Sequence, residues 1–514
     1  MRAEEVKIRT ELSDLVSKPP LSDLQRFAQV YPGPLYLVGG FLRDLALREA
    51  GHLGRLEEID CAVRGAEGCA RAFAKSVRGR AISLDPRTWR VVMGGQEGRP
   101  GWVDFAELRG EDIEADLHGR DFTVNALACR LPLQGNGEPC LIDPCGGLCD
   151  LADRVLRAVS PTVIQEDPIR ALRAYRLAAQ WALSLEAKTE ELLVRERHLI
   201  SRSAPERVRE EGFRLLRLPS ATPAVRRMVD AGLLFTLLPE CEAMKGLAQS
   251  DERGYHTGDL LSHALDTLAA LEALLEEGDP GRSVYEGLFP GHGWRFRRYL
   301  RPLFGAPVLK LAALLHDMGK PQCQRKGANG AIHFYGHEEV GAEMADSLAR
   351  RLRFSRRERE CLMRLIRLHM RLPSLMTSFG GRPLSRRAVF RLGREAGEEL
   401  PGLILLGGAD ARAKGGPFAP SEAFLTFARG FLETLNQVLG KAPEVGPTPG
   451  RGTPPTRWLN GHDLQDLFGL PPGPRLGEIL SALAEAQAIG EVGSREEALA
   501  WVERFLKRGE TCKE

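Results

Sequence analysis

Two acidic residues stand two positions apart in the stretch LEEIDCAVRG, residues 56–65. Glu58 and Asp60 alternate with apolar residues, which is the pattern of a short strand that has one buried face. Side chains at positions i and i+2 of a strand share a face about 6.5 Å apart, so both carboxylates can reach the same bound divalent ions. Asp104, in the stretch GWVDFAEL, lies on another expected strand and would complete an acidic cluster. Taken alone, an E-x-D pattern more often marks a solvated strand edge.

A pair of glycines precedes this acidic strand. The stretch LYLVGGFLRDLAL reads as an apolar strand, then Gly39 and Gly40, then an amphipathic helix. Glycines let backbone N–H groups approach a ligand closely, and the N-terminus of the following helix favours anions. The order of strand, glycine pair, helix and acidic strand favours a metal site at Glu58 and Asp60 over a solvated edge.

Polar residues interrupt the apolar stretch DLHGRDFTVNALACRL, residues 116–131. Arg120, Asp121 and Asn125 lie near what the pattern predicts to be the start of a helix. Asp121 would serve there as the N-cap, because aspartate accepts hydrogen bonds from the first free N–H groups of a helix. The pattern alone therefore explains Asp121 structurally.

A further acid and two arginines lie in IQEDPIRALRAYRLAAQ, residues 164–180. Pro168 suits the first turn of a helix, so Asp167 is expected to be its N-cap. Arg170 and Arg173 follow Asp167 by three and six positions, so Asp167 and Arg170 can project together. An acceptor beside a guanidinium group can read the polar edge of a nucleobase.

Histidines and aspartates recur in the apolar, helical second half of the chain. Unpaired burial of such groups is costly, and a set of them that includes an adjacent His-Asp pair is hard to explain as packing. Imidazole with carboxylate suits Mn, Fe, Ni, Zn or Mg better than a thiolate zinc site does. The residues of this set are His256, His263, His316, Asp317, His337, His369 and Asp410.

Length and composition limit the class of protein. A chain of 514 residues exceeds one hydrophobic core and suggests three or four domains. No apolar run approaches the roughly 18 residues of a membrane span, and the N-terminus has no signal-peptide core. The ten cysteines are scattered, which fits reduced thiols and a cytoplasmic location. The net charge of +2 does not indicate nucleic acid, although arginines cluster in GWRFRRYLRP, residues 293–302, and in RLRFSRRERE.

The patterning predicts an α+β head followed by helical domains. Several apolar segments of the head are linked too tightly for helical crossovers, so its sheet is expected to be mixed rather than doubly wound. A Pro/Gly-rich stretch predicts a linker near the C-terminus, and short helices follow it. The expected segments are a mixed-sheet head at 1–160, a helical neck and body at 161–245, a helical metal-binding domain at 246–438, a linker at 439–457 and a small helical tail at 458–514.

The motifs GGFLRD, EEID, GRDFTVNALA, EDPIRALRAYRLAAQ and SAPERVREE occur together in this order. They resemble the motifs of class II tRNA nucleotidyltransferases and bacterial poly(A) polymerases, and the resemblance covers about residues 30–240. It implies a nucleotidyltransferase head and Mg-dependent, template-independent addition of nucleotides from CTP or ATP to the 3′ end of tRNA or another RNA.

The resemblance also implies a role for each motif residue. The acidic pair Glu58 and Asp60 would bind Mg²⁺, with Asp104 as the third acid. The groups that would hold phosphates are Gly39, Gly40 and Arg43. Those that would contact the sugar and triphosphate are Arg120, Asp121 and Asn125. Those that would read the base are Asp167 and Arg170, supported by Arg173.

The chain departs from the family pattern at three places. Glu58 stands where the family usually has aspartate, and Gly119 stands where it often has arginine. The segment between Asp104 and Arg120 is also shorter than in members that build the whole CCA end. A short segment there resembles enzymes that add only CC, so partial CC addition is expected. A-adding, complete CCA-adding and poly(A)-adding activities are the alternatives, because they share the other motifs.

The histidine set resembles the HD phosphohydrolase superfamily, whose pattern is H…HD…D. This resemblance implies a divalent metal and allows a phosphohydrolase activity, with Lys320 placed to meet a phosphate. One competing hypothesis makes this the principal activity, with a head that only binds RNA; another makes the chain a non-catalytic RNA-binding protein. The matching residues are His263, His316, Asp317 and Asp410, with His337 and His369 for a second metal or for substrate.

Overall fold

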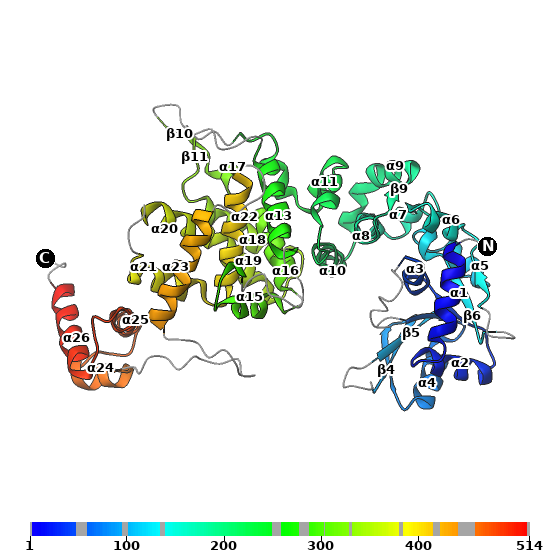
Figure 1. The fold of residues 1–514 in the computed structure, drawn as a ribbon, viewed down its shortest axis with the longest axis horizontal. Helices are drawn as coiled ribbons and strands as arrows, with labels where there is room; N and C mark the ends of the chain where they lie inside the picture. Colours follow the sequence, from blue (N-terminus) through cyan, green and yellow to red (C-terminus); the bar gives the residue numbers. More distant parts are fainter. Residues whose placement is uncertain are drawn as a thin grey trace. The chain divides into compact units, whose positions relative to one another are not determined.

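The computed structural model places most of the chain in two compact units (Figure 1). The first comprises residues 1–218 and 223–237, and the second comprises residues 219–222 and 238–514. The residues that the structure describes are 3–47, 59–94, 101–133, 139–248, 259–276, 287–302, 304–327, 332–379, 384–414, 422–439 and 458–510.

The first unit begins with a seven-stranded sheet in the order β3-β4-β5-β2-β1-β6-β7. Strands β2 and β5 pair parallel and the other neighbours pair antiparallel, so the predicted mixed sheet is confirmed. The strands are β1 (Leu35–Val38), β2 (Ile59–Val63), β3 (Arg80–Asp85), β4 (Thr88–Met93), β5 (Gly101–Glu107), β6 (Ala128–Leu131) and β7 (Leu141–Ile142).

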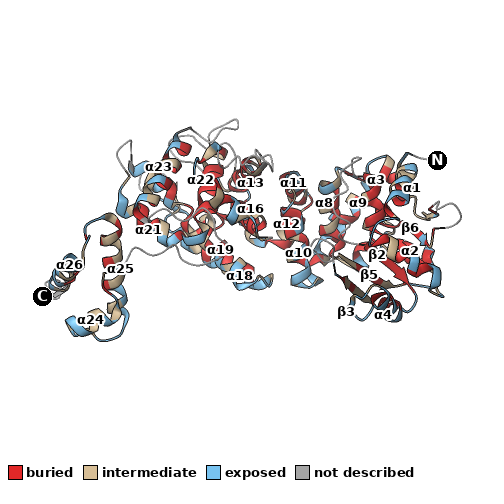
Figure 2. Cartoon of the chain, turned by 60° about the horizontal axis from the view of Figure 1, so that its bottom comes forward, coloured by how far each residue is buried: buried red, intermediate tan, exposed pale blue. Residues whose placement is uncertain are grey.

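Burial alternates along β4 and β5, β2 is buried at every position except Asp60, and β3 at the edge of the sheet is mostly exposed. Phe105 on β5 is fully buried and its ring lies 5.4 Å from that of Phe73, on the helix that covers this part of the sheet. Figure 2 shows buried residues along β2 and β5 and on the helices that pack against the sheet. The helices of this region are α1 (Ala3–Leu15), α2 (Leu21–Val30), α3 (Gly40–Leu47), α4 (Ala66–Ser76), α5 (Ile113–His118) and α6 (Gly147–Ala152).

The helix expected after Arg120 does not form. Residues Thr123–Asn125 make a single 3-10 turn, η2, and the chain then enters β6. The prediction was wrong because Val124, Ala126 and their neighbours are all buried. The segment therefore has no exposed face and lacks the periodicity of an amphipathic helix. Strand β6 instead pairs with β1 along its whole length.

Short helices continue the first unit after the sheet. The helix expected to start at Pro168 begins at Arg170, and Asp167 ends the preceding short helix instead of capping the next. These elements are β8 (Val155–Leu156), α7 (Val163–Glu166), α8 (Arg170–Trp181), β9 (Ser184–Leu185), α9 (Ala187–Glu196), η3 (Arg197–Arg202), α10 (Pro205–Leu216), α11 (Thr222–Asp230) and α12 (Leu233–Leu237).

The second unit is a helical bundle, as the patterning predicts. Its centre is formed by α13, α16, α18, α19 and α22, and α16 is buried at every position except Ala306. The elements are η4 (Pro239–Met244), α13 (Leu260–Glu276), α15 (Gly293–Leu300), α16 (Gly305–Leu315), α17 (Lys320–Cys323), β10 (Arg325–Lys326), β11 (Ile332–His333), α18 (His337–Arg351), α19 (Arg356–Leu368), α20 (Arg371–Phe379), α21 (Arg386–Ala396), η5 (Gly397–Glu399), α22 (Leu400–Lys414) and α23 (Glu422–Leu439).

A small helical tail with its own apolar cluster follows. Of the linker expected at 439–457, Leu439 is the last residue of α23, and residues 440–457 lie outside the described residues. Ion pairs from Arg387 and Arg391 on α21 to Glu485 connect the tail to the bundle. Among the described residues, no helix is long and apolar enough to cross a membrane. The tail helices are α24 (Gly461–Phe468), α25 (Pro474–Ile489) and α26 (Arg495–Glu510).

Candidate active site and metal centre

Asp60 and Asp104 lie side by side on the two parallel strands of the head sheet. The register of β2 and β5 pairs these two residues directly. Residues paired across strands share a face, and the same row continues to Val38 on β1 and to Arg90 on β4. Within β2, Asp60 is exposed and its four neighbours are buried. The sheet therefore presents Asp60 to solvent beside the end of β1.

Arg90 binds the Asp104 carboxylate through two hydrogen bonds. Its Nε donates to Oδ1 and its Nη2 to Oδ2, at 2.8 and 2.7 Å. Such a bidentate, charge-assisted pair engages both carboxylate oxygens, so Asp104 would bind a metal by exchanging Arg90 for it. Glu58 lies outside the described residues. The roles of Glu58 and Asp104 as metal ligands stay predictions.

At Gly39 the backbone lies close to a guanidinium group, that of Arg120, and to a carboxylate, that of Asp60. Its φ of +74° lies in the left-handed region that favours glycine. A Cβ atom at Gly39 would lie 3.0 Å from Arg120 Nη1 and 3.9 Å from Asp60 Oδ2. The other edge of Arg120 is held by Asp116, which accepts from Nε and Nη2 at 3.0 and 2.9 Å. The positive φ favours glycine, a Cβ atom here would crowd the end of the Arg120 side chain, and the space beside Gly39 adjoins both a carboxylate and a guanidinium group.

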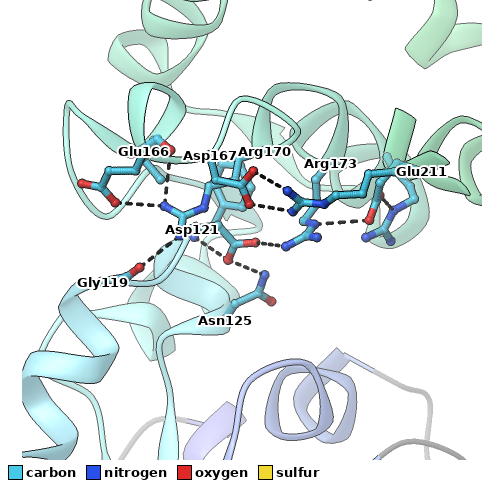
Figure 3. A network of polar contacts seen from close by, with 12 residues as sticks. Gly119, Asp121, Asn125, Glu166, Asp167, Arg170, Arg173 and Glu211 are labelled. Atoms are coloured by element: carbon cyan, nitrogen blue, oxygen red, sulfur yellow. Dashed lines mark hydrogen bonds and ion pairs between the residues drawn. The ribbon is translucent and has the colours of Figure 1, made fainter. Parts of the chain in front are cut away.

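A chain of hydrogen bonds links Arg43 on α3 to α8, and Figure 3 shows the part of it from Asn125 to Glu211. Arg43 Nη1 donates to Asn125 Oδ1 at 2.5 Å, and Asn125 Nδ2 donates to Asp121 Oδ1 at 2.9 Å. Arg173 Nη1 donates to Asp121 Oδ2 at 3.1 Å. The Arg43 guanidinium group also lies over the Trp181 ring, 5.5 Å from its centre. Four residues that the sequence predicts for nucleotide binding thus form one connected polar network.

Asp121 is ionised at the centre of this network. Burial alone would raise the pKa of its carboxyl, but attraction to Arg173 and hydrogen bonds from Asn125 and the Phe122 N–H lower that pKa to about 2. A carboxyl whose pKa is depressed on folding stabilises the fold above its unfolded pKa, and this contribution is lost as the pH falls from about 4 through 2. The shift corresponds to about 2 kcal/mol at neutral pH.

Substitution of Asp121 by asparagine is therefore expected to lower the local free energy of opening at pH 7 by about 2 kcal/mol. Native-state hydrogen exchange of peptides covering residues 121–125 and 170–181 measures this quantity, and the expected acceleration is about thirtyfold. Asp14→Asn, at an exposed position of α1, is the control and should change exchange by less than about 0.5 kcal/mol. Equal protection in the wild type and Asp121→Asn would contradict this assignment.

The arginines of α8 find partners that the local spacing does not reveal. Asp167 accepts a bidentate pair from Arg207, at 2.9 and 2.8 Å, and not from Arg170. Arg170 donates to the carbonyl of Gly119 at 3.1 Å and to Glu166 Oε2 at 3.3 Å (Figure 3). The Asp167 carboxylate and the Arg170 guanidinium group therefore have different partners. Arg207 holds Asp167, whereas the Gly119 carbonyl and Glu166, one turn before Arg170, hold Arg170.

Glu211 anchors the far end of the network. Its carboxylate accepts from Arg173 Nε at 3.3 Å and from Arg176 Nε at 2.6 Å. Arg207 and Glu211 both lie in the motif SAPERVREE, for which the sequence alone suggests no roles. Their place in a family motif was the sequence signal for these two residues. Their partners lie 35 to 40 residues away, so local spacing does not reveal the contacts.

The second unit brings six predicted metal ligands into two adjoining groups. One ligand atom of each residue lies within 4.8 Å of the others in its group, and all six residues are buried. Asp317 connects the groups, because its Oδ2 lies 3.2 Å from His316 Nε2 and its Oδ1 lies 3.2 Å from His337 Nε2. The groups are His263, His316 and Asp410, and Asp317, His337 and His369. His256 lies outside the described residues.

The histidines are oriented as metal ligands would be. His316, His337 and His369 each place Nδ1 within hydrogen-bond distance, 2.7 to 2.9 Å, of a backbone carbonyl three residues earlier. A ring that donates from Nδ1 presents the lone pair of Nε2, and all three Nε2 atoms face the carboxylates. His316 Nε2 is buried and makes no well-aligned hydrogen bond to any described residue, although Asp317 Oδ2 lies 3.2 Å away. The residues therefore fit a divalent metal.

Lysines and histidines keep the two carboxylates of this centre ionised. Burial alone would raise the pKa of Asp317, but His316 and Lys320 hold it well below its usual value. The same balance lowers the pKa of Asp410, where Lys414 is the strongest opposing group. Lys320 and Lys414 approach these carboxylates at 2.6 and 2.7 Å. The sequence points to Lys320 but not to Lys414, which follows Asp410 by one helical turn.

Comparison with known proteins finds family models that match three regions of the chain. Residues 35–157 match the family model "Poly A polymerase head domain", residues 182–245 match "Probable RNA and SrmB- binding site of polymerase A", and residues 297–411 match "HD domain". The chain is 34% identical to the A-adding tRNA nucleotidyltransferase of Deinococcus radiodurans, over 93% of this chain and 96% of that protein. It is 32% identical to the CC-adding tRNA nucleotidyltransferase of Thermus thermophilus, over 92% of this chain and 93% of that protein.

A solved structure shares the fold at lower identity. The Thermotoga maritima CCA-adding enzyme complexed with tRNA aligns with a TM-score of 0.58 and 19% identity, over 97% of this chain and 98% of that one. The relatives, the family models and the arrangement of the head agree. The chain belongs to the tRNA nucleotidyltransferase family and has a poly(A) polymerase-type head and an HD domain.

Proposed function

We propose that this protein adds C residues from CTP to the 3′ ends of tRNAs that lack their CCA sequence. The observation that carries the proposal is the convergence of Gly39, Asp60 and Arg120 at the end of β1. A backbone that closely approaches a ligand, an exposed carboxylate and a positioned guanidinium group are the parts that phosphoryl transfer to a hydroxyl requires. The cysteine pattern supports a cytoplasmic location.

The head residues would position the nucleotide and the RNA end. Mg²⁺ held by Asp60 with Glu58 would neutralise phosphate charge and activate the 3′-hydroxyl. Arg120 Nη1 and the backbone at Gly39 would hold phosphate oxygens, and the network through Asp121 would keep Arg43 and Asn125 oriented toward the nucleotide. No covalent enzyme intermediate is needed, so catalysis depends on positioning and charge neutralisation.

Base reading is proposed for Asp167 and Arg170. Both are fixed by other groups, Asp167 by Arg207 and Arg170 by the Gly119 carbonyl. Gly119, which stands where the family often has arginine, needs neither a positive φ nor unusual space for itself. Its contribution here is the carbonyl group that orients Arg170.

The segment between the third acid and Arg120 supports addition of C over addition of A. Residues 104 to 120 are fully described, and after β5 they contain only a short turn and the six-residue helix α5. In the family, a longer flexible loop here helps the site change from C to A. The relatives include both A-adding and CC-adding enzymes, so A addition is the alternative.

A terminal-addition assay tests this proposal. The full chain is incubated with Mg²⁺, a tRNA transcript lacking CCA, and CTP or ATP supplied separately, and the products are sequenced. Two added C residues are expected from CTP alone, and no addition is expected from ATP alone. One A added only to tRNA ending in CC would indicate the A-adding alternative, and a long A tract would indicate a poly(A) polymerase. No incorporation of either nucleotide would contradict nucleotidyl transfer altogether.

For the second unit, we propose a centre for two divalent metals with phosphohydrolase activity. The bridging position of Asp317 between two histidine-containing groups supports it. Mn, Ni, Fe and Zn all suit imidazole with carboxylate ligands, and such a pair of ions would polarise a phosphate and supply a metal-bound nucleophile. Lys320 and Lys414, which pair with Asp317 and Asp410, would bind phosphate oxygens once metals replace them at the carboxylates.

A further inference from the structure

A cavity of about 450 Å³ lies within the second unit, apart from the metal centre. Its walls come from α15, α19, α21, α22, α23 and the short segments between them. Arg357 at the start of α19 and Leu400 at the start of α22 line it, whereas His369 and Asp410 lie further along these elements. Ten residues of helix separate Leu400 from Asp410, which is about 15 Å. The cavity is therefore distinct from the metal centre, and its volume is that of a small-molecule site.

Two guanidinium groups in this cavity have no carboxylate partner among the described residues. Arg295 donates from Nη2 to Asn436 Oδ1 at 2.8 Å, and its Nε is buried without a hydrogen-bond partner among the described residues. Burial lowers the pKa of Arg295, and no charged group in the described part of the chain offsets that effect. Arg298 also lines the cavity, and its side chain is exposed. A half-buried arginine without an acid costs stability unless a ligand supplies the negative charge.

The acids at the cavity already have partners. Glu398 pairs with Arg357 at 2.5 Å, and Glu399 pairs with Arg364 at 2.9 Å. The unmatched charge in the cavity is therefore positive. It belongs to the arginine cluster GWRFRRYLRP, to which neither nucleotidyl transfer nor the metal centre gives a role.

Aromatic rings form the apolar part of the wall. Trp294, Tyr299 and Phe304 line the cavity, and the Arg295 guanidinium group lies 4.8 Å from the centre of the Trp294 ring. Planar bases stack on such rings regardless of base identity, and arginine binds phosphate through two parallel hydrogen bonds. A ligand that satisfies both features carries a phosphate group and a flat aromatic body.

We propose that this cavity binds a free nucleoside monophosphate, with the phosphate on Arg295 and Arg298 and the base against Trp294. The small volume favours a single nucleotide over an RNA chain. This proposal does not depend on nucleotidyl transfer, because the cavity shares no residue with the head.

Hydrogen exchange of the full chain, titrated with AMP or CMP, tests the proposal. Slower exchange is expected in peptides covering residues 293–302 and 397–401, and head peptides report separately on binding at the head. In R295M the affinity should fall at least about tenfold, because a charge-assisted pair is lost. Adenosine alone and inorganic phosphate alone should each need at least about tenfold higher concentrations.

R297M is the matched control, since Arg297 is an exposed arginine on the same helix that does not line the cavity. It should bind AMP like the wild type. R298M removes an exposed charge without disturbing packing, so weaker binding in R298M supports the proposal even if R295M is poorly folded. Absence of protection in these peptides, equal binding by the wild type and R298M, or protection by a short RNA but not by AMP would overturn it.

Discussion

Substitution of Asp60 by alanine is expected to reduce nucleotide addition by roughly a thousandfold or more. The substitution removes the exposed carboxylate beside Gly39 and Arg120, and loss of a metal ligand costs several kcal/mol of transition-state stabilisation. Because Asp60 is exposed, the fold should remain intact. Single-turnover addition of labelled C to tRNA lacking CCA measures the effect, with Asp14→Ala as the control at an exposed position.

The addition assay, run beside an assay of phosphate-ester hydrolysis, separates the two candidate activities. If nucleotidyl transfer belongs to the head, Asp60→Ala loses addition but retains phosphate-ester hydrolysis, and His316→Ala shows the reverse. If the second unit were the principal catalyst and the head only bound RNA, Asp60→Ala would leave activity intact. Near wild-type addition by Asp60→Ala would contradict the proposed active site.

Glu58 is tested beside Asp60. Its longer side chain gives a metal ligand more rotamer freedom, so Glu58→Asp is expected to preserve or raise addition. Unchanged addition by Glu58→Ala would instead assign the metals to Asp60 and Asp104, with Arg90 displaced from Asp104.

Substitution of Asp317 is expected to remove metal from the second unit. Asp317 faces both ligand groups, one oxygen toward each. Loss of an outer-shell partner alone costs about 10- to 100-fold in metal affinity, so loss of this shared carboxylate should cost more than about a hundredfold. Metal analysis after dialysis against Mn²⁺, together with hydrolysis of bis-(p-nitrophenyl) phosphate, measures the loss. Asp317→Asn keeps the shape of the side chain and should behave like Asp317→Ala.

His333→Ala provides the matched control for this centre. His333 lies in the same unit but belongs to neither ligand group, and its ring stacks on Tyr335. It should retain metal and hydrolysis. Full metal content in Asp317→Asn would show that the two groups do not share this carboxylate, and would contradict the two-metal proposal. Nucleotide addition should be unaffected in all three variants.

The sequence by itself determined the classes of element and the order of the motifs. Short apolar segments located β1, β2, β3, β4 and β5, and in β2 the alternation of acidic and apolar residues pointed to Asp60. The histidines and aspartates within apolar helical segments indicated a metal centre, because such groups need polar or charged partners when they are buried. Both inferences rest on chemistry that is visible within a few residues.

The tertiary structure decided which charged groups meet. Local spacing pairs Asp167 with Arg170, but the structure pairs Asp167 with Arg207, 40 residues away. Arg90 on β4 binds Asp104 on the neighbouring strand β5, and Asp317 contacts histidines from different helices. A charged side chain is stabilised most where partners surround it after burial, and those partners come from distant segments. Periodicity describes only which face of an element is buried, so these pairings are decided when the elements pack.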